Sequence, residues 1–148
     1  MDIFEVTEAD RARAKEELNE PDDPSDAIGE LRESVKAAAW FSPVFEPRLD
    51  DQYVLRFLRV SKFDQATALS RLSSMFALQK EWHELFGEFT FASIEPLLKS
   101  GLAQVMSKRD KDGCIVLSMT AAKWDPSKFP IHVVYRSIMF IEEVLLLG

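Results

Sequence analysis

Apolar residues in the first half of the chain recur at the three- and four-residue spacing of helices. A nearly all-polar segment, 7–19, comes first, and three segments with an apolar stripe follow at 25–39, 50–60 and 64–86. Prolines separate the first segment from the second. A Ser, Thr or Asp side chain, which can cap a helix, stands where each helix could begin. The pattern predicts a small helical bundle that ends near Gly87, with its aromatic residues in the core. The expected N-caps are Thr7 (with Asp10 three positions on), Ser25 or Asp26, Asp50 or Asp51, and Asp64.

The second half opens and closes on helical signals. A short helix is predicted at 94–99, with Ser93 as its cap, Pro96 in its first turn and Gly101 as its stop. A longer helix is predicted to start near Pro130. It is apolar on almost every side, so it needs neighbours on most of them.

Between these helices, two strand-like runs predict an antiparallel hairpin. The runs, 102–107 and 114–120, flank an Asp-Gly turn signal at 112–113. Because the second run opens with four apolar residues in succession, we expect this strand to be buried on both faces. Cys114, the one cysteine, is then expected to be an inert, buried thiol.

The predicted fold class is α+β to α/β, in two parts. Residues 1–88 are expected to form an N-terminal helical subdomain, and residues 89–148 the start of a layered domain. The hairpin offers few strands for the last helix to pack on, and an isolated hairpin is marginal in water. We therefore expect the sequence to be a truncated form, with the missing partners beyond Gly148. If the chain does end there, we expect self-association through the C-terminal helix.

Composition narrows the class of protein. The 148 residues carry 25 acidic and 18 basic side chains, a net charge of −7, with no basic block, so nucleic acid is not an expected partner. The start of the chain lacks the apolar core of a secretory signal, which predicts a cytoplasmic protein. The apolar stretch 131–147 is too short and too often charged to predict a membrane span.

No motif in the sequence predicts an enzyme. Phosphate-binding glycine loops, nucleophile elbows and paired-cysteine motifs are absent. The two histidines, His83 and His132, lie far apart in the sequence, and the adjacent Glu142 and Glu143 point in different directions on a helix. We therefore expect no catalytic residues, no metal site and no cofactor. Whether a glutamate of this pair faces solvent or makes a polar contact inside a pocket is left open by the sequence.

Two blocks of sequence, in the same order, resemble the CRAL-TRIO lipid-binding family, in its animal branch. The first is LRFLRVSKF, from Leu55 to Phe63, followed by ELF at 84–86. The second is LLKSGLAQVMSKRDKDGCIVLSMTAAKWDP, which contains the family's R-D-x-x-G turn at 109–113 and the W-D pair at 124–125. The resemblance covers almost the whole chain.

The resemblance implies binding and intracellular transfer of a hydrophobic small molecule or lipid. The ligand of such a protein lies between a sheet and covering helices. The residues that would face it here are Met119, Tyr135, Ile138, Met139 and Glu142. Plain core packing is the alternative for each of them, because pockets and cores use the same apolar residues.

The resemblance also implies docking on phosphoinositide-containing membranes, endosomal or other internal ones, through Arg59 and Lys62. The family has a further arginine where this sequence has Ser61, whose hydroxyl cannot replace the charged guanidinium. A solvated or structural role for Arg59 and Lys62 is the alternative. For the chain as a whole, the alternative is a non-transferring fragment that acts as a protein-interaction module or has no function of its own.

Overall fold

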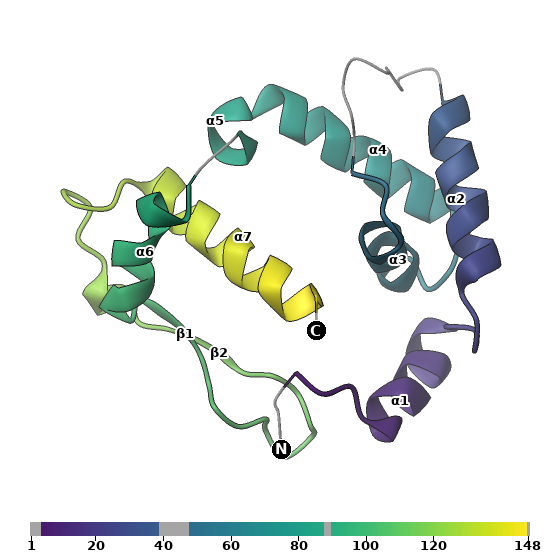
Figure 1. Cartoon of the computed structure of the whole chain (residues 1–148), viewed down its shortest axis with the longest axis horizontal. Helices are drawn as coiled ribbons and strands as arrows, with labels where there is room; N and C mark the ends of the chain where they lie inside the picture. Colours follow the sequence, from purple (N-terminus) through teal and green to yellow (C-terminus); the bar gives the residue numbers. More distant parts are fainter. Residues whose placement is uncertain (1–3, 39–47, 88–89, 148) are drawn as a thin grey trace. The chain divides into compact units, whose positions relative to one another are not determined.

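The computed structural model describes residues 4–38, 48–87 and 90–147 (Figure 1). They divide into two compact units, one from Val6 to Glu81 and the other from Trp82 onward together with residues 4–5. The first unit contains four helices among its described residues: α1 (Glu8–Leu18), α2 (Ser25–Ala37), α3 (Asp51–Val60) and α4 (Gln65–Glu81).

Helix α1 begins and ends as its sequence predicts. The Thr7 hydroxyl accepts a hydrogen bond from the Asp10 backbone N–H at 3.2 Å, and the Asp10 carboxylate accepts one from the Thr7 N–H at 2.9 Å. This reciprocal capping box satisfies two N–H groups that the first turn leaves without helical partners. Asn19 ends the helix in the left-handed conformation, at φ 60°.

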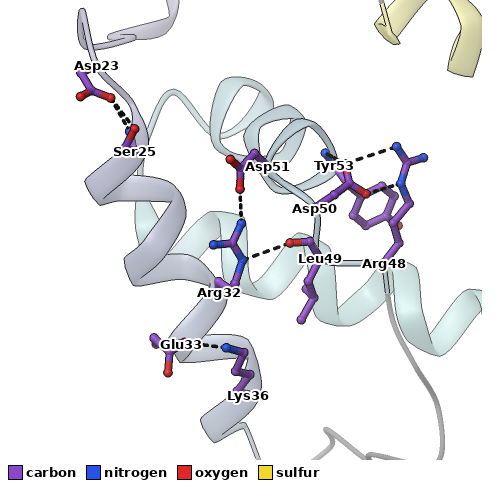
Figure 2. Close-up of polar contacts among 10 residues, drawn as sticks. All are labelled: Asp23, Ser25, Arg32, Glu33, Lys36, Arg48, Leu49, Asp50, Asp51 and Tyr53. Carbon is purple, nitrogen blue, oxygen red and sulfur yellow. Dashed lines mark hydrogen bonds and ion pairs between the residues drawn. The ribbon is translucent and has the colours of Figure 1, made fainter.

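The start of α2 differs from the prediction. Ser25 is the first helical residue and Pro24 holds the N-cap position, so neither Ser25 nor Asp26 is the cap. Asp23 takes that role from one residue further out, since its Oδ1 accepts from the Ser25 N–H at 2.9 Å and the Ser25 hydroxyl at 2.5 Å (Figure 2). These hydrogen bonds hold the pKa of the Asp23 carboxyl below its usual range.

The start of α3 is fixed both by its own cap and by α2. Asp50 is the N-cap and accepts from the Tyr53 N–H at 3.1 Å, as predicted. A hydrogen bond from Arg48 is the largest cause of the lowered pKa of Asp50. From α2, Arg32 donates to the Leu49 carbonyl at 3.0 Å and pairs with Asp51, which ties the two helices together (Figure 2).

The apolar stripes of α2, α3 and α4 meet in one core, and the three helices contact one another in pairs. The stripe predicted on α2 supplies Ile28, Leu31 and Val35, all buried. Leu58 and Leu72 are fully buried on α3 and α4. The polar α1 contributes no buried residue. The remaining buried members of this core are Tyr53, Val54, Phe57, Ala68 and Phe76.

The long helix predicted over 64–86 is interrupted. It ends at Glu81, and after Trp82 a short helix, α5 (His83–Phe86), starts in the second unit. Trp82 is 56% exposed, so the expectation that it packs in the bundle core is wrong. Arg136 of α7 (Ile131–Leu147) donates to the Glu84 and Leu85 carbonyls, and this capping of α5 by α7 explains why α5 groups with the later residues. The predicted domain boundary at 88 remains a prediction.

The second unit joins helices to a two-stranded sheet. Beside α5 and α7 it contains α6 (Phe91–Ser100), β1 (Ala103–Val105), β2 (Leu117–Met119) and a short 3₁₀ helix, η1 (Ala121–Lys123). Helices α6 and α7 pack on each other (Figure 1), and the rings of Phe91 and Phe140 lie 5.6 Å apart between centroids. Their core consists of Leu97, Leu102 and Val134.

Helix α6 starts earlier than predicted. Its first residue is Phe91, with Thr90 in the N-cap position, so Ser93 lies inside the first turn and donates its hydroxyl to the Thr90 carbonyl at 2.7 Å. Pro96 consequently falls beyond the first turn. Gly101 ends the helix in the left-handed conformation at φ 74°, as predicted.

The two strands pair antiparallel, with Gln104 opposite Ser118 and Val105 opposite Leu117, which confirms the hairpin. The second strand is shorter and more exposed than predicted: Leu117 is half-buried and Met119 is 54% exposed. Cys114 lies outside the strand and is exposed, so the expectation of a buried thiol is wrong.

The Asp110 side chain explains why the second strand is shorter than predicted and why Cys114 lies outside it. Its Oδ1 accepts from the Asp112 N–H at 2.9 Å and the Cys114 N–H at 2.8 Å. The turn therefore extends through Cys114, where the apolar run suggested a strand. Arg109 holds the same turn by donating to the Gly113 carbonyl at 2.9 Å and the Glu5 carbonyl at 2.8 Å.

Mostly helical structure with a small antiparallel sheet is the observed class, consistent with part of an α+β domain. The layered α/β arrangement remains a prediction. Over the described ranges, the structure contains no helix with the length and apolar character needed to cross a membrane.

The substitutions Gly101→Ala and Gly29→Ala should change the stability of the chain in opposite directions. Gly101→Ala places a Cβ on a residue at φ 74°, which we expect to cost about 1 kcal/mol of stability. Gly29, inside α2, has no atom within 4 Å of an added Cβ, so Gly29→Ala should stabilise the chain by about 0.5–1 kcal/mol. Urea unfolding of both variants measures the difference. Equal effects of the two substitutions would contradict the assigned left-handed cap.

Candidate functional site

Helix α7 buries one side and exposes another. Val134, Ser137 and Ile141 are spaced three and four residues apart and are all buried, so they mark the packed side. The Ser137 hydroxyl is satisfied inside the helix by donating to the Val133 carbonyl at 2.8 Å. On a neighbouring stripe of the same helix, Ile131 is 51% and Tyr135 53% exposed. Large apolar side chains therefore line an open face of α7.

The segment before α7 places an indole ring beside this face. Asp125 Oδ1 accepts from the Ser127 N–H at 3.0 Å and its hydroxyl at 2.6 Å, which closes a turn and lowers the pKa of the Asp125 carboxyl. The same turn brings the Phe129 carbonyl to the Trp124 Nε1–H, 2.8 Å away. With its one donor satisfied, Trp124 presents an apolar ring. The turn at the W-D-P motif therefore fixes the orientation of the Trp124 ring.

Together these parts form an apolar concavity within the second unit. Its volume is about 320 Å³, at the lower end of the range typical of small-molecule sites. The end of β2, η1 and α7 all contribute to it. Its lining is Leu102, Met119, Ala121, Trp124, Ile131, Val134, Tyr135 and Ile138. Such a surface can bind an apolar molecule by removing area from water, with the phenol of Tyr135 as a polar tip.

Of the five residues predicted to face a ligand, three line this concavity. Met119 comes from the end of β2, and Tyr135 and Ile138 from α7. Met139 is half-buried and Glu142 is exposed, and neither belongs to the lining. Glu142 follows Ile138 by four residues, so it continues the same stripe of α7 one turn further on. The structure brings the first three residues together and leaves the other two outside.

Several lining residues escaped the sequence reasoning. Ile131 and Val134 precede Tyr135 and Ile138 by the helical interval of four residues, so periodicity could have found them. Trp124 was predicted only as part of a loop marker. Its place in the site depends on the hydrogen bond to Phe129, which sequence patterns do not reveal.

The predicted phosphate-binding residues lie at the C-terminal end of α3. Arg59 and Lys62 are both exposed, and Lys62 has a left-handed backbone at φ 51°. Ser61 between them is only 7% exposed, and among the described residues its Oγ has no hydrogen-bond partner. This position therefore points into the helical unit, away from any external phosphate. Among the same residues, no cluster of three or more His, Cys, Asp or Glu side chains could hold a metal ion.

Comparison with known proteins supports the family resemblance that the sequence motifs indicate. No protein-family model matches the chain. The mouse (Mus musculus) alpha-tocopherol transfer protein-like is 32% identical over 145 residues, covering 97% of this chain and 41% of its own length. The human (Homo sapiens) protein of that name is also 32% identical, with 97% and 42% covered. Rat (Rattus norvegicus) clavesin-2 is 31% identical over 137 residues, with 90% and 41% covered.

This chain is a CRAL-TRIO homologue. The assignment rests on similarity that runs through almost all of its length, and it confirms the family and the branch predicted from the two motifs. The chain spans about two fifths of the length of the curated relatives it matches.

Proposed function

We propose that this CRAL-TRIO chain takes part in the binding and intracellular transfer of a hydrophobic small molecule or lipid, without catalysis. One observation carries the proposal: the apolar concavity where Met119, Tyr135 and Ile138 meet. The mouse and human relatives are named for their likeness to a protein that transfers alpha-tocopherol, a hydrophobic molecule, which supports this class of ligand.

The binding energy would come from apolar area removed from water. At roughly 25 cal/mol per Å², covering about 200 Å² of ligand and lining yields on the order of 5 kcal/mol before the costs of association. Exposed side chains such as Met119 and Tyr135, 54% and 53% accessible, have that area to lose. Because apolar contact alone discriminates weakly between ligands of similar size, we propose a class of ligand and no single compound.

A photoreactive ligand tests the proposal. The probe is an uncharged prenyl alcohol with a diazirine, added to the full chain with and without excess unlabelled prenol. We expect label on peptides containing Met119 or residues 131–138 of α7, and we expect the competitor to remove it. Label that falls mainly on Val6–Glu81, or that the competitor does not reduce, would overturn the assignment of this site.

We further propose weak docking on phosphoinositide-containing membranes through the end of α3. Val60, which is 56% exposed, lies between Arg59 and Lys62 in the sequence, so the end of α3 offers two cations and one apolar side chain to a membrane interface. The net charge of −7 and the inward-facing Ser61 both weaken such an attraction.

A further inference from the structure

A two-bonded ion pair joins the end of α3 to the segment between α1 and α2. Arg59 Nε donates to Glu20 Oε2 at 2.7 Å, and Arg59 Nη2 donates to Glu20 Oε1 at 2.7 Å. The Glu20 side chain is only 14% exposed, whereas that of Arg59 is 47% exposed. A guanidinium binds two phosphate oxygens through the same edge and geometry. The Glu20 carboxylate therefore already occupies the edge of Arg59 that a phosphate would use.

The backbone holds Glu20 in this position. Its N–H donates to the Ala14 carbonyl at 3.2 Å, across the left-handed turn at Asn19. The Asn19 side-chain amide donates to the Lys62 carbonyl at 3.3 Å, immediately beyond α3. The segment after α1 is thus fixed to its own helix and to the end of α3, which presents the carboxylate to Arg59 with little freedom to move away.

A second ion pair of opposite charges lies close to Arg59 and Glu20. Arg59 and Glu20 lie in a concavity of about 470 Å³ whose remaining wall comes from Val6, α1 and the segment that follows α1. Lys15 in that wall pairs with Asp22, with Nζ 2.8 Å from Oδ1. Acidic residues of the segment 20–22 therefore neutralise cations of both α1 and α3.

We propose that Glu20 is an internal competitor for Arg59, so that a phosphate monoester binds Arg59 only when the segment 19–22 is released. This inference rests on the proposed membrane docking and adds its regulation. Binding of phosphate and pairing with Glu20 exclude each other, so by linkage each weakens the other by the same factor. Pairing with Glu20 explains how the exposed Arg59 of an acidic protein can fail to bind phosphate until a phosphate-rich surface displaces the Glu20 carboxylate.

The test compares two charge-equivalent variants of the full chain. Glu20→Gln removes the competing charge, and Glu17→Gln removes one charge from an exposed position of α1 as the matched control. Affinity is measured by sedimentation with phosphatidylcholine vesicles containing bisphosphorylated inositol lipid, and with vesicles containing phosphatidylserine. We expect Glu20→Gln to bind the inositol lipid about three- to tenfold more tightly than the unmodified chain, and Glu17→Gln less than twofold more tightly. Competition by soluble inositol phosphate identifies the headgroup as the ligand.

Two further variants, Arg59→Gln alone and Arg59→Gln combined with Glu20→Gln, distinguish the competitor role of Glu20 from membrane docking through Arg59. Adding Arg59→Gln to Glu20→Gln should remove the whole gain, and the Glu20 amide should exchange hydrogen faster when inositol phosphate binds the unmodified chain. If Arg59→Gln alone weakens binding but Glu20→Gln matches Glu17→Gln, the competitor role is wrong and docking stands. If neither Glu20→Gln nor Arg59→Gln changes binding, or if the gain survives in the double variant, both ideas fail. The hydrophobic ligand site is independent of these outcomes.

Discussion

Ser61→Arg is expected to destabilise the helical unit by about 2 kcal/mol or more and to create no phosphate site. The family's arginine would enter a position that is 7% exposed, where Ser61 packs at the end of α3. Its backbone N–H is bonded to the Phe57 and Leu58 carbonyls at 3.2 and 3.1 Å, which fixes the direction of the side chain. A long cation must therefore either displace core side chains or unwind the cap to reach water.

Ser61→Ala is the matched control. Among the described residues the Ser61 Oγ has no partner, so its removal should leave stability unchanged or raise it by up to about 1 kcal/mol. Urea unfolding followed by circular dichroism measures both variants, and vesicle sedimentation measures phosphoinositide binding. An arginine variant as stable as the unmodified chain, with several-fold tighter binding, would show that this position can face a membrane.

The helical core was predictable because one physical signal dominates it. Ile28, Leu31 and Val35 repeat at helical spacing on a segment whose other positions are largely polar, and burial follows directly. Capping boxes are equally local, so Thr7 and Asp10 could be recognised from four residues of sequence. The same reasoning failed at α6, where Ser93 was predicted as the cap but Thr90 holds the N-cap position.

The misses elsewhere have identifiable causes. The apolar run from Cys114 indicated a buried strand, but the Asp110 carboxylate bonds two N–H groups of the turn and extends it through that residue. Trp82 fell near the helical period of α4, although the helix ends one residue earlier and exposes the ring. In both places a hydrogen bond or helix boundary overrides the hydrophobic pattern.

The site was predictable only in part. Met119, Tyr135 and Ile138 came from family resemblance and meet in one concavity, whereas Trp124 enters it through a tertiary hydrogen bond that no periodicity encodes. The Arg59–Glu20 pair joins residues 39 positions apart, so the sequence could show the charge of Arg59 but not its partner.

Tyr135→Lys should weaken binding of an apolar ligand about tenfold. Losing roughly 60 Å² of apolar contact, at about 25 cal/mol per Å², corresponds to that factor. Tyr135 is 53% exposed and lines the concavity, so its replacement should leave the fold intact. Val144 is the matched control: it is 42% exposed on the same helix, nine residues further on, and therefore points to the opposite side.

The most direct measurement is a fluorescence titration of the full chain and these two variants with an uncharged, fluorophore-bearing prenyl alcohol. Circular dichroism and urea unfolding confirm that both variants fold like the unmodified chain. The proposed site predicts saturable binding by the unmodified chain, an approximately tenfold higher Kd for Tyr135→Lys, and a Kd within twofold for Val144→Lys. The absence of saturable binding, or equal affinities for the two lysine variants, would contradict a hydrophobic ligand site on this face of α7.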